Sequence, residues 1–292
     1  MTSAEFTPFS LNLPGGRLVE FDRPQVMGIL NVTPDSFYAG SRSFGEDAIR
    51  ARVRTLVEEG ADMIDIGAYS SRPGAADVSE DEELRRLDTG MRVLREEAPE
   101  LPVSVDTFRA EVARRAVCEM GVDIVNDISG GNLDERMWTV VADLHVPYIL
   151  MHMRGTPQDM MAHTAYGNVT VDVIRELGSR LQQLALQGVA DVIVDPGFGF
   201  SKTLDQNYRM MHDLPLFATL GRPLLVGVSR KSMITRPLGI TPDEALAGTV
   251  ALGTIALMHG GASILRVHDV AAARQSVIVT GCAFPLSECH CS

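Results

Sequence analysis

Eight short apolar runs, separated by segments with helical periodicity, constrain the fold of this chain most strongly. Each run is continuously apolar rather than alternating, which is typical of strands buried on both faces of a parallel sheet. The runs are QVMGILN (25–31), DMIDIG (62–67), PVSVD (102–106), VDIVND (122–127), PYILMH (147–152), DVIVD (191–195), PLLVGVS (223–229) and SILRVHD (263–269). We therefore expect eight parallel strands.

Segments between these runs carry apolar side chains at helical spacing, with charged side chains on the opposite face. Ser79 precedes Glu82 by three residues, which predicts a capping box at the start of one helix. The clearest helical segments are 46–60, 79–99, 168–188 and 241–260. Alternating strands and helices predict an α/β fold, and eight such units favour a (β/α)8 TIM barrel over an open doubly wound sheet.

Residues 9–21 form two short apolar stretches around a Pro-Gly-Gly turn, which predicts an N-terminal β-hairpin over one end of the barrel. No Pro-rich or Ser-rich linker interrupts the pattern, so we expect a single domain over residues 1–281. The segment 282–292 departs from the pattern, and we expect it to be a disordered tail.

The formal net charge of −12 argues against a nucleic acid or an anionic membrane as partner, because both require a basic surface. The N-terminus lacks the pattern of a secretory signal. The uncharged run 245–258 is shorter than the ~20 residues that a transmembrane helix needs. Four cysteines, three of them near the C-terminus, give no disulfide framework, so we expect a reducing, cytoplasmic location.

Polar side chains follow every one of the eight predicted strands. In TIM barrels the active site lies at this carboxyl end of the strands. One buried acid at a strand end is more often structural, but gathering many desolvated groups at one rim costs stability unless a ligand or a network satisfies them. The strand ends carry Asn31, Asp65, Asp106, Asn126, Asp127, His152, Arg154, Asp195, Ser229, Arg230, Lys231, Ser232, Arg266, His268 and Asp269.

The chemistry of these groups indicates two kinds of ligand surface. Asp106, Asn126 and Asp195 offer acceptors, which suit a heterocycle rich in N–H donors. Lys231, Arg266 and His268, together with Asn31, suit a phosphate or diphosphate. No serine or cysteine lies in a recognisable nucleophile motif, so covalent catalysis is not indicated.

Three Gly-rich loops follow predicted strands. The segments 31–44 and 67–79 are longer than ordinary turns, and we expect them to be mobile covers over the barrel mouth. The third, DPGFGF (195–200), lacks the last glycine of a dinucleotide-binding motif. GVSRKS (227–232) lacks the glycines of a P-loop, which argues against nucleotide binding.

Together these stretches resemble the dihydropteroate synthase family of folate biosynthesis. The resemblance rests on GILNVTPDSF (28–37), SSRPGA (70–75), VDT (105–107), NDISGG (126–131), MHMRGTP (151–157), DPGFGF (195–200), SRKS (229–232) and RVHD (266–269). It implies a TIM barrel that joins a dihydropterin methyl diphosphate to 4-aminobenzoate and releases diphosphate, with Mg2+. It also implies a homodimer formed through outer helices, and a sulfonamide target.

The resemblance assigns a role to each matching position. Asp106, Asn126 and Asp195 would hold the pterin, with Lys231 on its other side. Arg266 would lie beside the ring and meet the diphosphate, which Asn31 and His268 would also hold, with Asn31 near Mg2+. We assign catalytic roles to Asp106, Asp195, Lys231, Arg266 and His268. The aminobenzoate would be framed by Phe37, Ser71, Arg72, Pro73, Phe200 and Ser232.

The second loop departs from the family pattern. Here it begins Gly67-Ala68-Tyr69, where the family has Gly-Gly-Glu or Gly-Gly-Gln.

Two other functions are compatible with parts of the sequence. A pterin-dependent methyltransferase that serves corrinoid proteins would share the acceptor set but would not need the Ser-Arg-Lys-Ser and Arg-Val-His clusters. A catalytically inactive paralogue would be expected to lose a charged group, yet Asn31, Lys231, Arg266 and His268 are all present.

Overall fold

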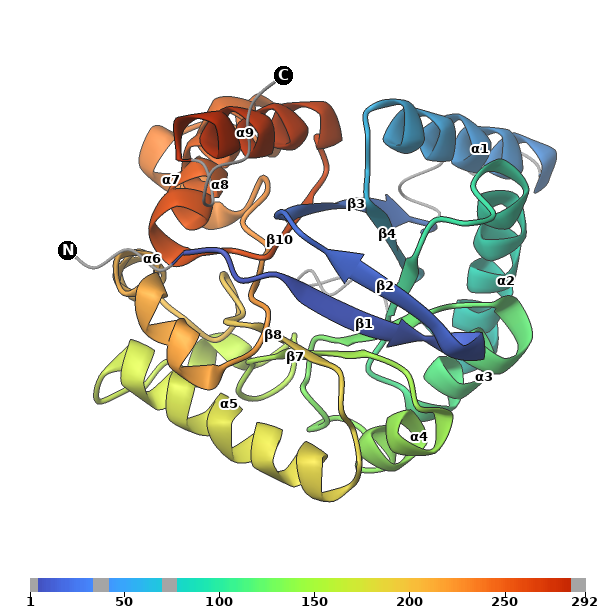
Figure 1. The fold of residues 1–292 in the computed structure, drawn as a ribbon, viewed down its shortest axis with the longest axis horizontal. Coiled ribbons are helices and arrows are strands. Elements are labelled where there is room, and N and C mark those ends of the chain that lie inside the picture. Colours follow the sequence, from blue (N-terminus) through green and yellow to red (C-terminus); the bar gives the residue numbers. More distant parts are fainter. Residues whose placement is uncertain (1–4, 34–41, 70–77, 285–292) are drawn as a thin grey trace.

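A computed structural model describes residues 5–33, 42–69 and 78–284 of the chain. Eight parallel strands form one sheet in the order β8-β7-β6-β5-β4-β3-β10-β9 (Figure 1). A parallel bridge between Val194 and Leu224 joins the two ends of this sheet, so the strands close into a barrel. The strands are β3 (Gln25–Asn31), β4 (Met63–Gly67), β5 (Val103–Asp106), β6 (Ile124–Asp127), β7 (Tyr148–Met151), β8 (Val192–Asp195), β9 (Leu225–Val226) and β10 (Ile264–Val267). The predicted eight-stranded parallel barrel is confirmed.

Helices surround the barrel and follow the strands in turn (Figure 1). The α-helices are α1 (Arg42–Glu58), α2 (Glu80–Glu97), α3 (Ala110–Met120), α4 (Met137–Leu144), α5 (Val169–Leu186), α6 (Leu204–His212), α7 (Ser232–Leu238), α8 (Leu246–Gly260) and α9 (Val270–Ala283). Short 3-10 turns are η1 (Pro14–Gly16), η3 (Met160–Ala162), η4 (Leu214–Leu220) and η5 (Pro242–Glu244). The Ser79 hydroxyl accepts from the N–H of Glu82, as predicted, whereas the Glu82 carboxylate binds Arg85 and Arg86.

The predicted N-terminal hairpin consists of β1 (Phe9–Leu13) and β2 (Arg17–Phe21). It lies across the barrel in Figure 1. Its buried side chains join one apolar cluster with inward-facing residues near the start of the barrel strands. The cluster contains Leu11, Leu13, Phe21, Met27, Met63, Ile124, Ile149, Ile193, Leu225 and Ile264. The hairpin therefore closes the end where the strands begin, opposite to their carboxyl ends.

The two-residue period of a strand explains how polar side chains enter this barrel. Ile124 belongs to the apolar cluster beneath the hairpin, and Asn126 faces the same interior two residues later. Ile193 and Asp195 repeat the arrangement on β8. Alternate residues such as Val125 instead pack outward against the helices. The barrel interior is thus apolar at one end and polar at the other.

The C-terminal boundary differs from the prediction. Helix α9 extends to Ala283, so Cys282 and Ala283 are helical rather than part of a tail beginning at 282. The apolar pattern of the helix continues through Val279, and the helix end lies after it. Residues 285–292 lie outside the described part of the chain. Within the described ranges, no helix has the length and apolar character needed to cross a membrane.

Candidate active site

Four neighbouring strands bring residues at or next to their carboxyl ends to one level of the barrel rim. The register pairs Asn31 with Gly67, Gly67 with Asp106, and Asp106 with Asn126. Gly67 has no side chain to separate its neighbours. A Cβ at this position would lie 3.4 Å from Cβ of Asp106 and 3.9 Å from Oδ1 of Asn31. The carboxylate of Asp106 and the amide of Asn31 therefore lie on either side of one glycine.

Arg266 connects the acceptors across the barrel interior. Its Nε donates to Oδ2 of Asp65 at 2.6 Å, and its Nη2 donates to Oδ2 of Asp106 at 2.8 Å. The amide Nδ2 of Asn126 lies 3.2 Å from both oxygens of Asp65, which also accepts from the Ser104 hydroxyl at 2.5 Å. Asp65 is fully buried. Its carboxylate therefore orients the guanidinium and the amide that face the mouth.

Lys231 and Asp195 complete the site from the opposite side. A Cβ on Gly227 would lie 3.8 Å from Nζ of Lys231, 3.9 Å from Cβ of Arg266 and 4.0 Å from Oδ2 of Asp195. These three residues thus surround a single point. Asp195 accepts from the N–H of Gly197 at 2.8 Å through its other carboxylate oxygen. The residues predicted to bind the heterocycle and its charged group therefore lie together at one rim.

Burial shifts the pKa of Asp106, Asp195 and Lys231 at this rim. Desolvation raises the pKa of Asp106 to about 7, against the opposing effect of the Arg266 charge. Desolvation also raises the pKa of Asp195, which Lys231 counteracts. It lowers the pKa of Lys231 to about 8. Such mutually opposed shifts in one place are characteristic of functional sites.

His268 is a neutral group at this rim. Burial, and then the nearby charges of Arg266 and Arg230, lower its pKa to about 4, so the imidazole is neutral near pH 7. Ser229 Oγ accepts the backbone N–H of His268 at 3.2 Å and lies 3.0 Å from Nδ1. In the tautomer in which the hydroxyl donates to Nδ1, the Nε2–H group is left as a neutral donor.

An apolar wall adjoins the polar groups. Ile128, Met151, Met153 and Met160 form a buried cluster against which Phe200 packs. The ammonium of Lys231 lies 4.8 Å from the centre of the Phe200 ring. Ser232 is exposed at the first residue of α7. An apolar surface beside acceptors suits a flat ring with polar edges.

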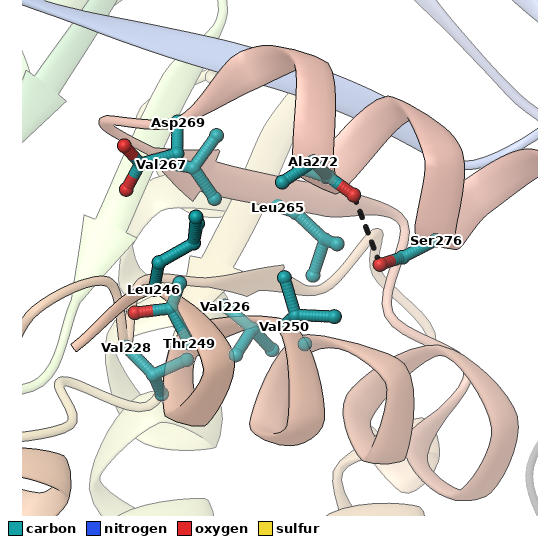
Figure 2. Close-up of a pocket in the computed structure, with 12 residues that line it drawn as sticks. Val226, Val228, Leu246, Thr249, Val250, Leu265, Val267, Asp269, Ala272 and Ser276 are labelled. Carbon is teal, nitrogen blue, oxygen red and sulfur yellow. Dashed lines mark hydrogen bonds between the residues drawn. The ribbon is translucent and has the colours of Figure 1, made fainter. Parts of the chain in front are cut away.

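A separate cavity lies behind the barrel wall, between α8, α9 and the strands β9 and β10 (Figure 2). Its lining is mainly aliphatic, and Ser276 uses its hydroxyl to bind the carbonyl of Ala272 at 3.1 Å. The cavity measures ≈ 10 Å³. That volume is at the lower limit for one water molecule, so this cavity is a packing gap and the rim is the candidate site.

Comparison with known proteins agrees with this geometry. The family model described as pterin binding enzyme matches residues 27–268. A dihydropteroate synthase of Synechocystis sp. is 44% identical over 269 residues, covering 90% of this chain and 92% of the relative. The chain belongs to the dihydropteroate synthase family.

Two solved structures of the Xanthomonas albilineans dihydropteroate synthase extend the likeness to three dimensions. The structure with 4-aminobenzoic acid has a TM-score of 0.87 at 40% identity and covers 96% of this chain and 100% of the other. The structure in complex with 7,8-dihydropteroate has a TM-score of 0.84 at 37% identity and covers 95% and 100%. The fold and the family expected from the motifs are thus confirmed.

Four predicted site residues lie outside the described part of the chain, as do most of the two loops expected to be covers. They are Phe37, Ser71, Arg72 and Pro73. The departure from the family pattern at Tyr69 is visible. Its ring packs edge-on against Phe108 at 5.1 Å, and the guanidinium of Arg109 lies 5.4 Å from it. Tyr69 is therefore held by aromatic and cation–π contacts.

Several strand-end groups serve the scaffold. Asp127 accepts from Ser129, Gly131 and Tyr148, and so shapes the loop after β6. Arg230 pairs with Asp269 at 2.7 Å. Hydrogen bonds and an ion pair within the protein satisfy these groups, so they need no ligand.

Sequence reasoning gave no role to Asp65 or Ser229, although both were among the strand-end residues. It also missed Lys202, which lies beyond the end of β8. The alternation on β4 places Asp65 inward, two residues after Met63, and this signal could have identified it.

Proposed function

We propose that this chain is a dihydropteroate synthase that condenses (7,8-dihydropterin-6-yl)methyl diphosphate with 4-aminobenzoate to give 7,8-dihydropteroate and diphosphate. One observation carries the proposal: the acceptors Asp106, Asn126 and Asp195 share a single rim with the cations Lys231 and Arg266. The same rim can bind a donor-rich bicyclic ring and its anionic substituent. The family to which the chain belongs supports this substrate pair.

The pterin would bind through its donor edge. Asp195 and Asp106 accept hydrogen bonds from amino and ring N–H groups, and Asn126 can both donate and accept. Lys231 would approach the ring from the other side and would offset the charge of Asp195. Because these groups are already desolvated, their hydrogen bonds to the ring are stronger than in water.

The bond from the pterin methylene carbon to the diphosphate oxygen would break first, and the oxygen would leave with the electron pair. The resulting cation is delocalised over the electron-rich pterin, so no protein nucleophile is required. The aminobenzoate nitrogen then forms the new bond to the methylene carbon and loses a proton. An aryl amine is neutral near pH 7, so no strong base is needed.

The leaving group would be stabilised by charge and hydrogen bonds at the rim. Arg266 supplies a permanent positive charge, and His268 supplies a neutral N–H. The carboxylates of Asp106 and Asp195 would stabilise the pterin cation electrostatically. Exclusion of water from the apolar wall near Phe200 would favour the amine over hydrolysis.

Mg2+ is part of the proposal. In the described ranges, no group of three or more His, Cys, Asp and Glu side chains could hold a metal by itself. Asn31 nevertheless places an amide oxygen at the rim, and Mg2+ commonly uses one or two protein oxygens together with substrate phosphates. The residues therefore fit an ion that arrives with the diphosphate, with Asn31 as its protein ligand. Such an ion would neutralise charge on the leaving group.

The aminobenzoate would bind on the outer side of the pterin. Phe200 and Ser232 lie near Lys231 in the described part of the chain. Phe37, Ser71, Arg72 and Pro73 complete the proposed set, with Arg72 suited to the carboxylate. Sulfonamides share the aryl amine, and we propose that they compete at this position.

A diphosphate-release assay tests this function. The synthase requires release that depends on both the pterin diphosphate and 4-aminobenzoate, with dihydropteroate formed in equal amount. Transfer of a methyl group from a methyl-pterin to a corrinoid protein would instead support the methyltransferase alternative. Binding of the pterin without release of diphosphate would support an inactive paralogue.

We propose a homodimer formed through α8 and α9. Both helices expose aliphatic side chains, chiefly Ile255, Met258, Ile278 and Val279. The two helices pack side by side (Figure 1), and we infer that their exposed side chains contribute to one interface. A surface of this kind on a folded protein usually marks an interface. We also propose a cytoplasmic location, with which the exposed thiol of Cys118 is compatible.

A further inference from the structure

The lysines of this chain have an unusual distribution. Of its 26 basic Lys and Arg residues, only Lys202 and Lys231 are lysines, and every other one is arginine. Both lysines donate to backbone carbonyls of the same short loop, residues 197–200, which follows β8. Lys231 belongs to the proposed pterin site. Lys202 has no place in the proposed reaction, yet its side chain is 2% exposed.

The ammonium of Lys202 joins two strand ends. It donates to the carbonyls of Gly197 and Phe200, both at 3.0 Å, and to Nδ1 of His152 at 3.1 Å. The carbonyl of His152 lies 3.4 Å away. His152 follows β7, whereas the loop 197–200 follows β8. The amine of Lys202, whose pKa burial lowers to about 7, therefore fastens the loop to the neighbouring strand.

The approach between these segments is too close for a side chain at Gly197. Its φ of +71° is in the left-handed region, and a Cβ there would lie 2.0 Å from the carbonyl oxygen of His152. Two carbonyls, of His152 and Gly197, thus face one cation. Without a positive charge these dipoles would repel each other in a desolvated space.

The loop in turn positions the ligand-facing groups. The N–H of Gly197 binds Asp195 at 2.8 Å, and the carbonyl of Phe198 accepts from Lys231 at 2.6 Å. Gly199 N–H binds Asn207 at 2.7 Å. Both residues that flank the proposed pterin position are therefore tied to backbone groups that Lys202 holds in place.

His152 and Glu176 fix the position of Lys202 itself. Burial, and then the charge of Lys202, lower the pKa of His152 to about 4, so its ring is neutral and Nδ1 accepts from the ammonium. Nε2 then donates to the carboxylate of Glu176 at 3.0 Å. Arg154 pairs with the same carboxylate. The network is fully paired, as a buried charge requires.

We propose that Lys202 is a positioning residue for the transfer reaction, which sets Lys231 and Asp195 in their pterin-binding geometry by fastening the loop 197–200 to the end of β7. The proposal deepens the proposed function and depends on it for its kinetic consequence. The proposal also predicts a change in the pKa of Lys231, which can be measured without substrate.

The scarcity of lysine makes that environment directly measurable. Protein labelled with 13C at lysine Cε gives signals from only the two lysines of this chain, and Lys202→Met leaves the signal of Lys231 alone. In the wild type we expect Lys231 to titrate near the pKa of about 8 that burial imposes. In Lys202→Met the loss of a nearby positive charge and the entry of water through the loosened loop both act upward, and the midpoint should rise by at least about one unit toward the ordinary value of roughly 10.4. Lys202→Gln loses the same charge, so the difference between the two variants reports the loop.

Kinetics supply the second measurement. Lys231 and Asp195 bind the ring in the ground state, and Asp195 also stabilises the cation that develops as diphosphate leaves, so Lys202→Met should raise KM for the pterin diphosphate about tenfold and should also lower kcat. Thr170→Val serves as a matched control. It removes a buried 2.9 Å hydrogen bond to Asp213 that involves no residue of the loop 197–200, and it should change neither KM nor the Lys231 midpoint.

Lys202→Gln provides a second test if Lys202→Met does not fold. Its amide can still donate to the loop carbonyls without a charge, and we expect intermediate values of KM and midpoint. The proposal is overturned if a folded Lys202 variant retains the wild-type Lys231 midpoint and the wild-type KM. A shifted midpoint in a protein whose wild type releases no diphosphate would instead leave the positioning role intact and refute the synthase function.

Discussion

Asp195 illustrates how a single buried residue can be prepared for a ligand. Its side chain is almost completely buried, and one oxygen is bound by Gly197 while the other faces Lys231 and Arg266. Burial alone would favour the neutral acid, but the two cations favour the carboxylate. The net pKa is raised, and the two cations counteract part of the effect of burial.

Replacement of Asp195 by Ala should strongly reduce activity. Removing a buried, charge-assisted acceptor should cost at least about 2 kcal/mol of transition-state stabilisation, which is roughly a 30-fold loss in kcat/KM. Steady-state kinetics with both substrates measure this loss. Asp143→Ala, at an exposed position of α4, is the control and should retain wild-type kinetics. Wild-type kinetics in Asp195→Ala would refute its role in binding the pterin.

The pH dependence of pterin binding should depend on Lys231. Its pKa is lowered to about 8, so the ammonium is charged below that pH and loses its charge as the pH rises through it. Affinity for the pterin diphosphate should therefore fall between about pH 7 and pH 9. Calorimetric titration measures the fall, and Lys231→Met should bind more weakly and should lose the part of the fall centred near pH 8, whereas any change near pH 7 reports Asp106. An identical pH dependence in that variant would contradict the assignment.

The sequence could locate these side chains but could not give their partners. Alternation along a strand places Asp106 and Asn126 on the inner face, because side chains on a strand change face at every residue. The contacts of Arg266 with Asp65 and Asp106 depend on how far β10 lies from β4 and β5 across a closed barrel. For the same reason, the neutral state of His268 follows only from its burial and neighbouring charges.

At the scale of elements, the two ends of the barrel differ in role. The end beneath the hairpin is an apolar cluster that stabilises the fold, and the rim at the carboxyl ends of the strands carries the groups that bind ligands. The hairpin was predictable because its turn and its two apolar stretches are local features. Which end of the barrel the hairpin closes was not predictable, because its position depends on contacts with strands far along the chain. The end of α9 was also misjudged, because the helix continues for two residues into a segment whose composition changes.

Leu11→Ala tests this difference in role. Leu11 is almost fully buried in the cluster beneath the hairpin, and its truncation should cost about 3 kcal/mol of unfolding free energy. Denaturant unfolding measures the cost, and KM for both substrates should stay unchanged at temperatures where the variant is folded. Leu18→Ala, at a half-exposed position of the same hairpin, should cost much less. A raised KM in folded Leu11→Ala would show that the two ends are coupled.

At the scale of the whole molecule, helices α8 and α9 expose apolar side chains where a solitary barrel would carry polar ones. Ile278→Glu places a charge in the proposed dimer interface and should convert the protein to monomers in sedimentation analysis. Leu186→Glu is the matched control, since it changes an exposed leucine at the end of α5. A wild-type protein that sediments as a monomer would refute the proposed homodimer.

A crystal structure of the protein with the pterin diphosphate tests the central claim most directly. We predict that the donor edge of the pterin lies within hydrogen-bond distance of Asp106, Asn126 and Asp195, and that the diphosphate lies beside Arg266 and His268. A pterin bound elsewhere, or one whose donor edge faces away from these acceptors, would contradict the account.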